Sequence, residues 1–162
     1  MADTIEIQAG SFAHQVYGNL WIGNAPPITS VHERGFGLEP LSGSFDTLVL
    51  CAREYQLHGS LFAVEEVIHA PMDDELCPVK LGTSTMAISA ARKVAKKLAM
   101  GEHVLVTCLA GRNRSGLVCA LALCLGESDF SAAESIRLVR NARGVNSLAN
   151  PFFVKFLKSA VK

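Results

Sequence analysis

The chain has 162 residues, a length that suits one domain of ordinary size spanning residues 1–162. Apolar residues make up 49% of it, yet its longest uninterrupted apolar stretch, residues 117–125, is far too short to cross a bilayer. The N-terminal residues lack the pattern of a signal peptide, so we expect a cytoplasmic protein with no membrane span.

Strand-length runs rich in β-branched and apolar residues predict four strands. They are residues 20–23, 45–51, 65–70 and 103–107. Between the first two, residues 35–44 contain three glycines and one proline and are expected to form a surface loop.

Helical periodicity and end signals predict four helices. The first runs from about residue 84 to 100 and has an apolar stripe at Ile88, Ala91, Ala95 and Leu98, and the second covers residues 115–125. The third begins at a capping box formed by Ser131 and Glu134 and ends near Gly144, and the fourth begins at Asn150 and Pro151. Gly101 is expected to cap the first of them. Strands that alternate with helices predict an α/β domain with a central, mostly parallel sheet flanked by helices.

The five cysteines include no CxxC pair, and neither they nor the histidines have the spacing of zinc ligands. We therefore expect no disulfide scaffold and no metal site, which leaves at least one cysteine free to act as a nucleophile. Residues 1–78 carry 2 basic and 11 acidic side chains, whereas residues 79–162 carry 13 basic and 4 acidic ones. Such a basic half can contain an anion-binding site, although a solvated helix face explains the basic cluster at residues 92–97.

Residues 107–116, TCLAGRNRSG, lie where a buried strand is followed by an apolar helix, the usual ligand site of an open α/β sheet. Backbone N–H groups of such a loop can bind an oxyanion at the helix N-terminus. Gly111 allows the backbone to curl, Arg114 presents a planar fork to two phosphate oxygens, and the helix dipole and the guanidinium favour a Cys108 thiolate. We call residues 108–114 the phosphate loop.

The spacing Cys-x5-Arg is a weak signal by itself, and a core cysteine beside a surface arginine is the alternative. The apolar strand before the loop, the glycine within it, the serine after the arginine and the apolar helix that follows favour a phosphate site. The sequence therefore predicts Cys108 as the nucleophile of a phosphate-binding site.

The segment CLAGRNRSG resembles the signature loop of protein tyrosine phosphatases, specifically of their dual-specificity branch. Further segments are similar to that family in the same order, namely residues 20–24 (LWIGN), 68–74 (IHAPMDD) and 136–153 with Arg140, Arg143 and Asn150. The resemblance covers nearly the whole chain and implies a protein-tyrosine-phosphatase-like fold. It also implies hydrolysis through a phosphocysteine intermediate with no metal and no cofactor.

The resemblance assigns roles within that reaction. Cys108 attacks the phosphate, and Ser115 hydrogen-bonds the cysteine sulfur. The resemblance places the general acid and base three residues after Pro71, which selects Asp74 over Asp73. The phosphate-binding residues are Leu109, Ala110, Gly111, Arg112, Asn113 and Arg114. This sequence departs from the family at Thr107, where a histidine usually helps to set the loop geometry and the thiolate.

Cys51 resembles a cysteine that in some relatives forms a reversible disulfide with the nucleophile, although a buried structural cysteine fits the same apolar run. After mild peroxide treatment we expect Cys51, and not Cys77, to link to the nucleophile.

Among substrates, we expect a phosphoprotein first, phosphorylated on tyrosine and also on serine or threonine. The variable loop positions contain one basic residue, Arg112, and the acids at residues 73–75 should disfavour highly anionic substrates such as RNA ends. The alternatives are a phospholipid or nucleotide-type phosphatase of the same mechanism, or a catalytically silent phosphopeptide-binding module. No nucleic-acid partner is expected, and the sequence leaves the oligomeric state open.

Overall fold

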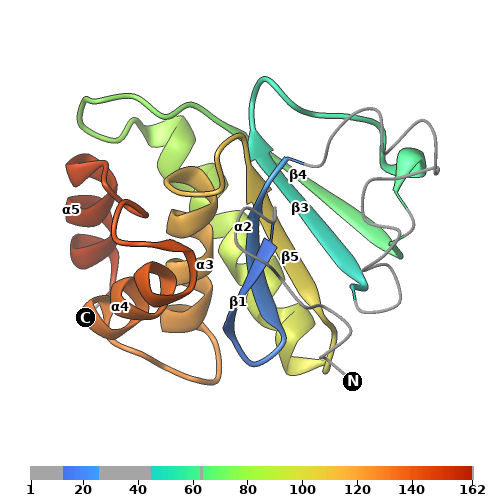
Figure 1. Ribbon diagram of the computed structural model, residues 1–162. Helices are drawn as coiled ribbons and strands as arrows, with labels where there is room; N and C mark the ends of the chain where they lie inside the picture. The colour runs from blue at the N-terminus through green and yellow to red at the C-terminus, as the bar shows by residue number, and fades with distance from the viewer. Residues whose placement is uncertain (1–12, 26–44, 63, 162) are drawn as a thin grey trace.

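The computed structural model describes residues 13–25, 45–62 and 64–161. Its five strands form one sheet in the order β1-β2-β5-β3-β4 (Figure 1). They are β1 (Ala13–Tyr17), β2 (Leu20–Asn24), β3 (Thr47–Ala52), β4 (Glu66–Met72) and β5 (Val104–Cys108). β1 pairs antiparallel with β2, and all other neighbours run parallel, so the expected mostly parallel sheet is confirmed.

The central strands β3 and β5 are buried on both faces, which is why their sequences are nearly continuous apolar runs. Along β5, Val104, Val106 and Cys108 belong to the larger hydrophobic core under the helices, whereas Leu105 belongs to a smaller cluster on the opposite face. Cys51 in β3 lies in the larger core as well. The period of two thus directs Cys108, the last residue of β5, to the helix-covered face.

Four α-helices accompany the sheet in the described part of the chain, with one short 3-10 turn at Gly59–Leu61. They are α2 (Leu81–Ala99), α3 (Arg114–Leu125), α4 (Ala132–Arg143) and α5 (Pro151–Ala160). Helix α3 contacts all three others and is buried over every residue except Leu125, which explains why its sequence is apolar after Arg114 and Ser115 (Figure 1). None of these helices is long and apolar enough to cross a membrane.

The helix-end signals in the sequence correspond to real caps. Ser131 accepts a hydrogen bond from the backbone of Glu134, whose side chain accepts one from the backbone of Ser131, which is the predicted capping box. Asn150 accepts from the backbone N–H of Phe152 at 3.0 Å at the start of α5. Gly101 follows α2 with a φ of 83°, a left-handed conformation that suits glycine.

Strand β1 and helix α2 differ from the sequence prediction. Strand β1 was not predicted, because it is short and three of its five residues are not buried, so its sequence lacks a clear apolar pattern. Its antiparallel pairing with β2 defines it as a strand. Helix α2 begins at Leu81, earlier than expected, because the chain turns helical after Lys80 without a side-chain cap. Ser84, the expected start, lies in the first turn and donates its hydroxyl to the carbonyl of Leu81 at 2.9 Å.

The buried residues of α2 are Ala87, Ala90, Ala91 and Val94. The apolar stripe is therefore displaced from the predicted one, of which only Ala91 is fully buried. The surface loop predicted at residues 35–44 lies outside the described residues.

Leu121 tests the core around α3, because its side chain is fully buried. We expect Leu121→Ala to lower the free energy of unfolding by about 2–5 kcal/mol, since the neighbours cannot close the cavity left behind. Urea unfolding at pH 7 measures the loss. Leu125→Ala in the same helix is the matched control, because that leucine is 38% exposed and should cost much less. Equal losses in the two variants would contradict this packing.

Candidate active site

The phosphate loop connects the carboxyl end of β5 to the N-terminus of α3, where the sequence placed it. Gly111 has a φ of +68°, and a Cβ built on it would lie 2.5 Å from the carbonyl carbon of Gly23. The loop therefore packs directly on the end of β2, and only glycine permits this approach. This close contact is the reason for a glycine at position 111.

Each carbonyl from residue 109 to 112 accepts a hydrogen bond from protein outside the loop. Leu109 accepts from the backbone of Ala25 at 3.4 Å, and the carbonyl of Arg112 accepts from the backbone of Leu148 at 3.1 Å. The carbonyls of the two residues between them accept from the guanidinium of Arg143, Gly111 at 3.1 Å and Ala110 at 3.3 Å.

These hydrogen bonds decide where the backbone donors of the loop point. In a trans peptide the C=O of one residue and the N–H of the next point in opposite directions. With the carbonyls of residues 109–112 directed at the surrounding protein, the N–H groups of residues 110–113 are directed to the inside of the loop. The inside of the loop is therefore a ring of donors that can bind an oxyanion.

Cys108 lies at the base of this ring and is 3% exposed. Its Sγ is 3.1 Å from the Oγ of Ser115 in the first turn of α3, so the predicted sulfur partner is within hydrogen-bond distance. Thr107, where the resembling family has histidine, is buried and donates its hydroxyl to the carbonyl of Val49 at 2.8 Å. This hydrogen bond ties β5 to β3 next to the cysteine.

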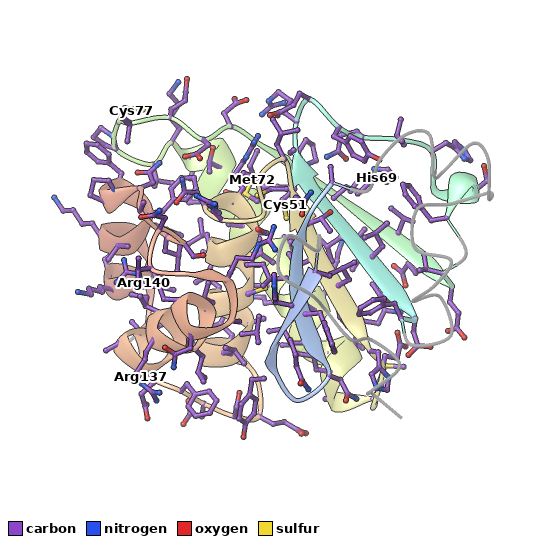
Figure 2. The ribbon with its side chains drawn as sticks, in the orientation of Figure 1. Cys51, His69, Met72, Cys77, Arg137 and Arg140 are labelled. Atoms are coloured by element: carbon purple, nitrogen blue, oxygen red, sulfur yellow. The ribbon has the colours of Figure 1, made fainter. Side chains whose placement is uncertain are left out.

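Arg114 is oriented by a carboxylate that the sequence analysis did not identify. Its Nη1 and Nη2 donate to the two carboxylate oxygens of Glu54 at 2.7 and 2.9 Å, and Nη1 also donates to the carbonyl of Met72 at 3.0 Å. Glu54 follows β3 by two residues and could have been suspected, because the carboxyl ends of parallel strands meet at one edge of a sheet. Figure 2 shows Cys51 and Met72 together at this edge.

The Nε of Arg114 is one of two buried side-chain nitrogen or oxygen atoms without a hydrogen-bond partner among the described residues. An unsatisfied buried donor is costly. Since Glu54 occupies the far end of the guanidinium, the free Nε of the arginine that closes the loop fits an anionic acceptor such as a phosphate oxygen.

The pair also alters the ionisation of both partners. The pKa of Glu54 is lowered from its usual 4.5 to about 2, chiefly by the hydrogen bonds from Arg114. Burial lowers the pKa of Arg114, but the hydrogen bonds to Glu54 and the charge of Cys108 outweigh burial, so that the net change is upward. The loop therefore keeps a fully charged guanidinium despite its burial.

The two neighbouring aspartates have different partners. Both carboxylate oxygens of Asp74 accept hydrogen bonds from amides of the site, from Asn113 at 2.9 Å and from Asn150 at 2.8 Å. Asp73 instead forms an ion pair with Arg53 at 2.9 Å. Of the two, Asp74 is thus the one bound to the phosphate loop.

The acids of residues 73–75 are largely neutralised, which the sequence did not indicate. In addition to the Asp73 pair, Glu75 lies 3.1 Å from the ammonium group of Lys80. The expected repulsion of highly anionic substrates is therefore weaker than three free carboxylates would produce.

Cys51 is fully buried at the end of β3, and its pKa is raised well above the usual value, first by burial and then by the charges of Cys108 and Cys119. Cys119 in α3 is buried as well, and burial also raises its pKa. Cys77 lies in the loop before α2, away from Cys51 in Figure 2. The disulfide between Cys51 and Cys108 stays a prediction, with Cys119 as a second buried thiol near the nucleophile.

The Glu54–Arg114 pair predicts a pH-dependent contribution to stability. In the folded protein the carboxylate stays ionised down to pH about 2, whereas the ordinary value of 4.5 applies in the unfolded chain. The pair therefore stabilises the fold above pH 4.5, and this contribution disappears as the pH falls toward 2. We expect Glu54→Gln to unfold at lower urea than the wild type at pH 6, and the difference in urea midpoint should shrink below pH 4.5 and close as the pH falls through about 2.

The effect should be modest, because the Glu54 side chain is 47% exposed and solvent screens the pair. Glu65→Gln is the control for loss of one negative charge, since Glu65 is exposed and no side-chain hydrogen bond involves it in the described structure. If the urea midpoints of the wild type and of Glu54→Gln differ by the same amount at every pH, the pairing of Glu54 with Arg114 is contradicted.

No protein-family model matches the sequence, and no curated protein matches it significantly. Solved structures do match. The active form of Tk-PTP is 21% identical with a TM-score of 0.69, covering 92% of this chain and 97% of that one. Human DUSP28 is 20% identical with a TM-score of 0.70 over 91% and 93%, and PTPMT1 in complex with PI(5)P is 18% identical with a TM-score of 0.68 over 91% and 93%. The chain therefore has an α/β fold of the protein tyrosine phosphatase type, in the form seen in DUSP28.

Proposed function

We propose that the chain is a cysteine-dependent phosphatase that hydrolyses phosphomonoesters through a phosphocysteine intermediate, with phosphotyrosine in proteins as its first substrate class and phosphoserine or phosphothreonine as further ones. The observation that carries the proposal is the ring of inward backbone donors closed by Arg114, with Cys108 at its base. The similarity in fold to known phosphatases supports it.

In the first step the Cys108 thiolate attacks phosphorus, a P–S bond forms, and the P–O bond to the leaving group breaks. Asp74 gives its proton to the leaving oxygen. The loop N–H groups and Arg114 stabilise the charge on the three remaining phosphate oxygens.

In the second step water attacks the phosphocysteine, and Asp74 takes up a proton from that water. The P–S bond breaks, its electron pair returns to the sulfur, and inorganic phosphate forms. The Ser115 hydroxyl, 3.1 Å from the sulfur, can donate a hydrogen bond to the departing thiolate.

Two exposed residues at the rim of the loop bear on the substrate. Leu109 is 52% exposed and offers an apolar contact to an aromatic ring, which favours phosphotyrosine. Arg112 is exposed and offers a positive charge to a second anionic group. This charge, with the PI(5)P complex of PTPMT1, favours a phospholipid phosphatase as the second candidate. A pseudophosphatase that only binds phosphopeptides would not need both the thiol and a proton donor.

Cys108→Ser tests the nucleophile. We expect it to abolish hydrolysis of an aryl phosphate while inorganic phosphate still binds, because the loop N–H groups and Arg114 remain. Steady-state kinetics and calorimetric titration with phosphate measure the two properties, and activity of the wild type should survive EDTA. Appreciable turnover by the serine variant would disprove the mechanism. Cys77→Ser, in the loop before α2, is the control and should keep wild-type turnover.

Asp74→Asn tests the proton donor. Since a positioned acid contributes about 10²–10⁴-fold, we expect a loss of that order in kcat for phosphotyrosine and a much smaller loss for an activated aryl phosphate, whose leaving group needs little protonation. Asp73→Asn is the neighbouring control and should have mild effects on both substrates. The reverse pattern would make Asp73 the acid, and two mild variants would exclude both residues.

A further inference from the structure

Asn113 occupies the N-cap position of α3 but does not cap it. An asparagine there ordinarily accepts a hydrogen bond from a backbone N–H of the first turn, whereas Asn113 makes no such bond. Its Nδ2 donates to Asp74 Oδ2 at 2.9 Å, and its Oδ1 accepts from the backbone N–H of Asn150 at 3.1 Å. A side chain of the phosphate loop is thus directed at the proposed proton donor.

Asn150 binds the other oxygen of the same carboxylate. Its Nδ2 donates to Asp74 Oδ1 at 2.8 Å and to the carbonyl of Glu75 at 3.0 Å, and its side-chain oxygen caps α5. Because the oxygens of both asparagines face backbone N–H groups, only the amide nitrogens can face Asp74, which excludes flipped amides. Three segments far apart in the sequence therefore meet at one carboxylate.

The segment that carries Asn150, residues 147–150, is itself fixed to the phosphate loop. Arg140 of α4, labelled in Figure 2, donates to the carbonyls of Ser147 and Leu148, both at 3.0 Å. The N–H of Leu148 donates to the carbonyl of Arg112. Leu148 is fully buried with a φ of 56°, a strained conformation that persists only where the surroundings determine it.

We infer that Asn113 and Asn150 are positioning residues that fix Asp74 above the phosphate loop. The inference rests on the proposed function, in which Asp74 transfers the proton. Asp74 is exposed, and its carboxylate is held by two amides, Asn113 of the phosphate loop and Asn150 at the start of α5. The phosphate-binding loop and α5 thereby set the position of the proton donor.

Asn113→Ala and Asn150→Ser test the inference by kinetics. Serine is a good N-cap without a charge, so the second variant keeps the cap of α5 and loses the amide donor. Because small misplacements of a catalytic group are costly, we expect kcat for phosphotyrosine to fall about 10–100-fold, with little change for an activated aryl phosphate and in inhibition by inorganic phosphate. In an Asp74→Asn background neither substitution should cause a further loss.

A loss that is equal for both substrates, or that persists in the Asp74→Asn background, would show that the asparagines act on phosphate binding and would overturn the inference. Asn146→Ser is the matched control. It makes the same substitution at an exposed position just before the 147–150 segment, and we expect kinetics like those of the wild type.

A second measurement separates this inference from the proposed function, because it needs no turnover. The ¹⁵N order parameters of residues 73–76 should be those of rigid backbone, about 0.85, in the wild type and in Asn146→Ser, and should fall toward about 0.6 in Asn113→Ala and Asn150→Ser. Unchanged order parameters would overturn the positioning role even if the enzyme is active. If the wild type hydrolyses no phosphomonoester but the order parameters still fall in the two asparagine variants, the positioning contact is upheld and the proposed function is refuted.

Discussion

The structure of the candidate site depends on the direction of four peptide groups. The carbonyls of residues 109–112 accept hydrogen bonds from Ala25 just after β2, from Arg143 on α4 and from Leu148, and this arrangement leaves the N–H groups of residues 110–113 to face inward. Without these outer donors nothing would hold the carbonyls outward and direct the N–H groups of the loop at an anion. Gly111 makes the arrangement sterically possible, because its backbone lies against Gly23.

The second requirement is a charge that stays fixed although it is buried. Glu54 binds both terminal nitrogens of Arg114, which keeps the guanidinium in one orientation and leaves Nε without a partner among the described residues. A lysine in place of this arginine could not make the same two-point contact with a carboxylate and a phosphate. The pair therefore couples the end of β3 to the loop after β5.

The site is also connected to the C-terminal helices, which contain no proposed catalytic residue. Arg143 and Arg140 act from α4, the first on the phosphate loop and the second on residues 147–150. The N-cap of α5, Asn150, contacts Asp74. Substitutions in these helices should therefore affect catalysis through their hydrogen bonds to the Asp74 carboxylate, to carbonyls of the phosphate loop and to carbonyls of residues 147–150.

The sequence by itself determined the α/β class, four of the five strands, the helix caps at Ser131 and Asn150, and the spacing of Cys108 and Arg114, because these features depend on local periodicity and short-range contacts. Only the tertiary structure revealed β1, the role of Glu54 and the different partners of Asp73 and Asp74, since each depends on groups distant in the sequence. Asn113 illustrates the difference: its position predicts a helix cap, but two partners 37 and 39 residues away take its side chain instead.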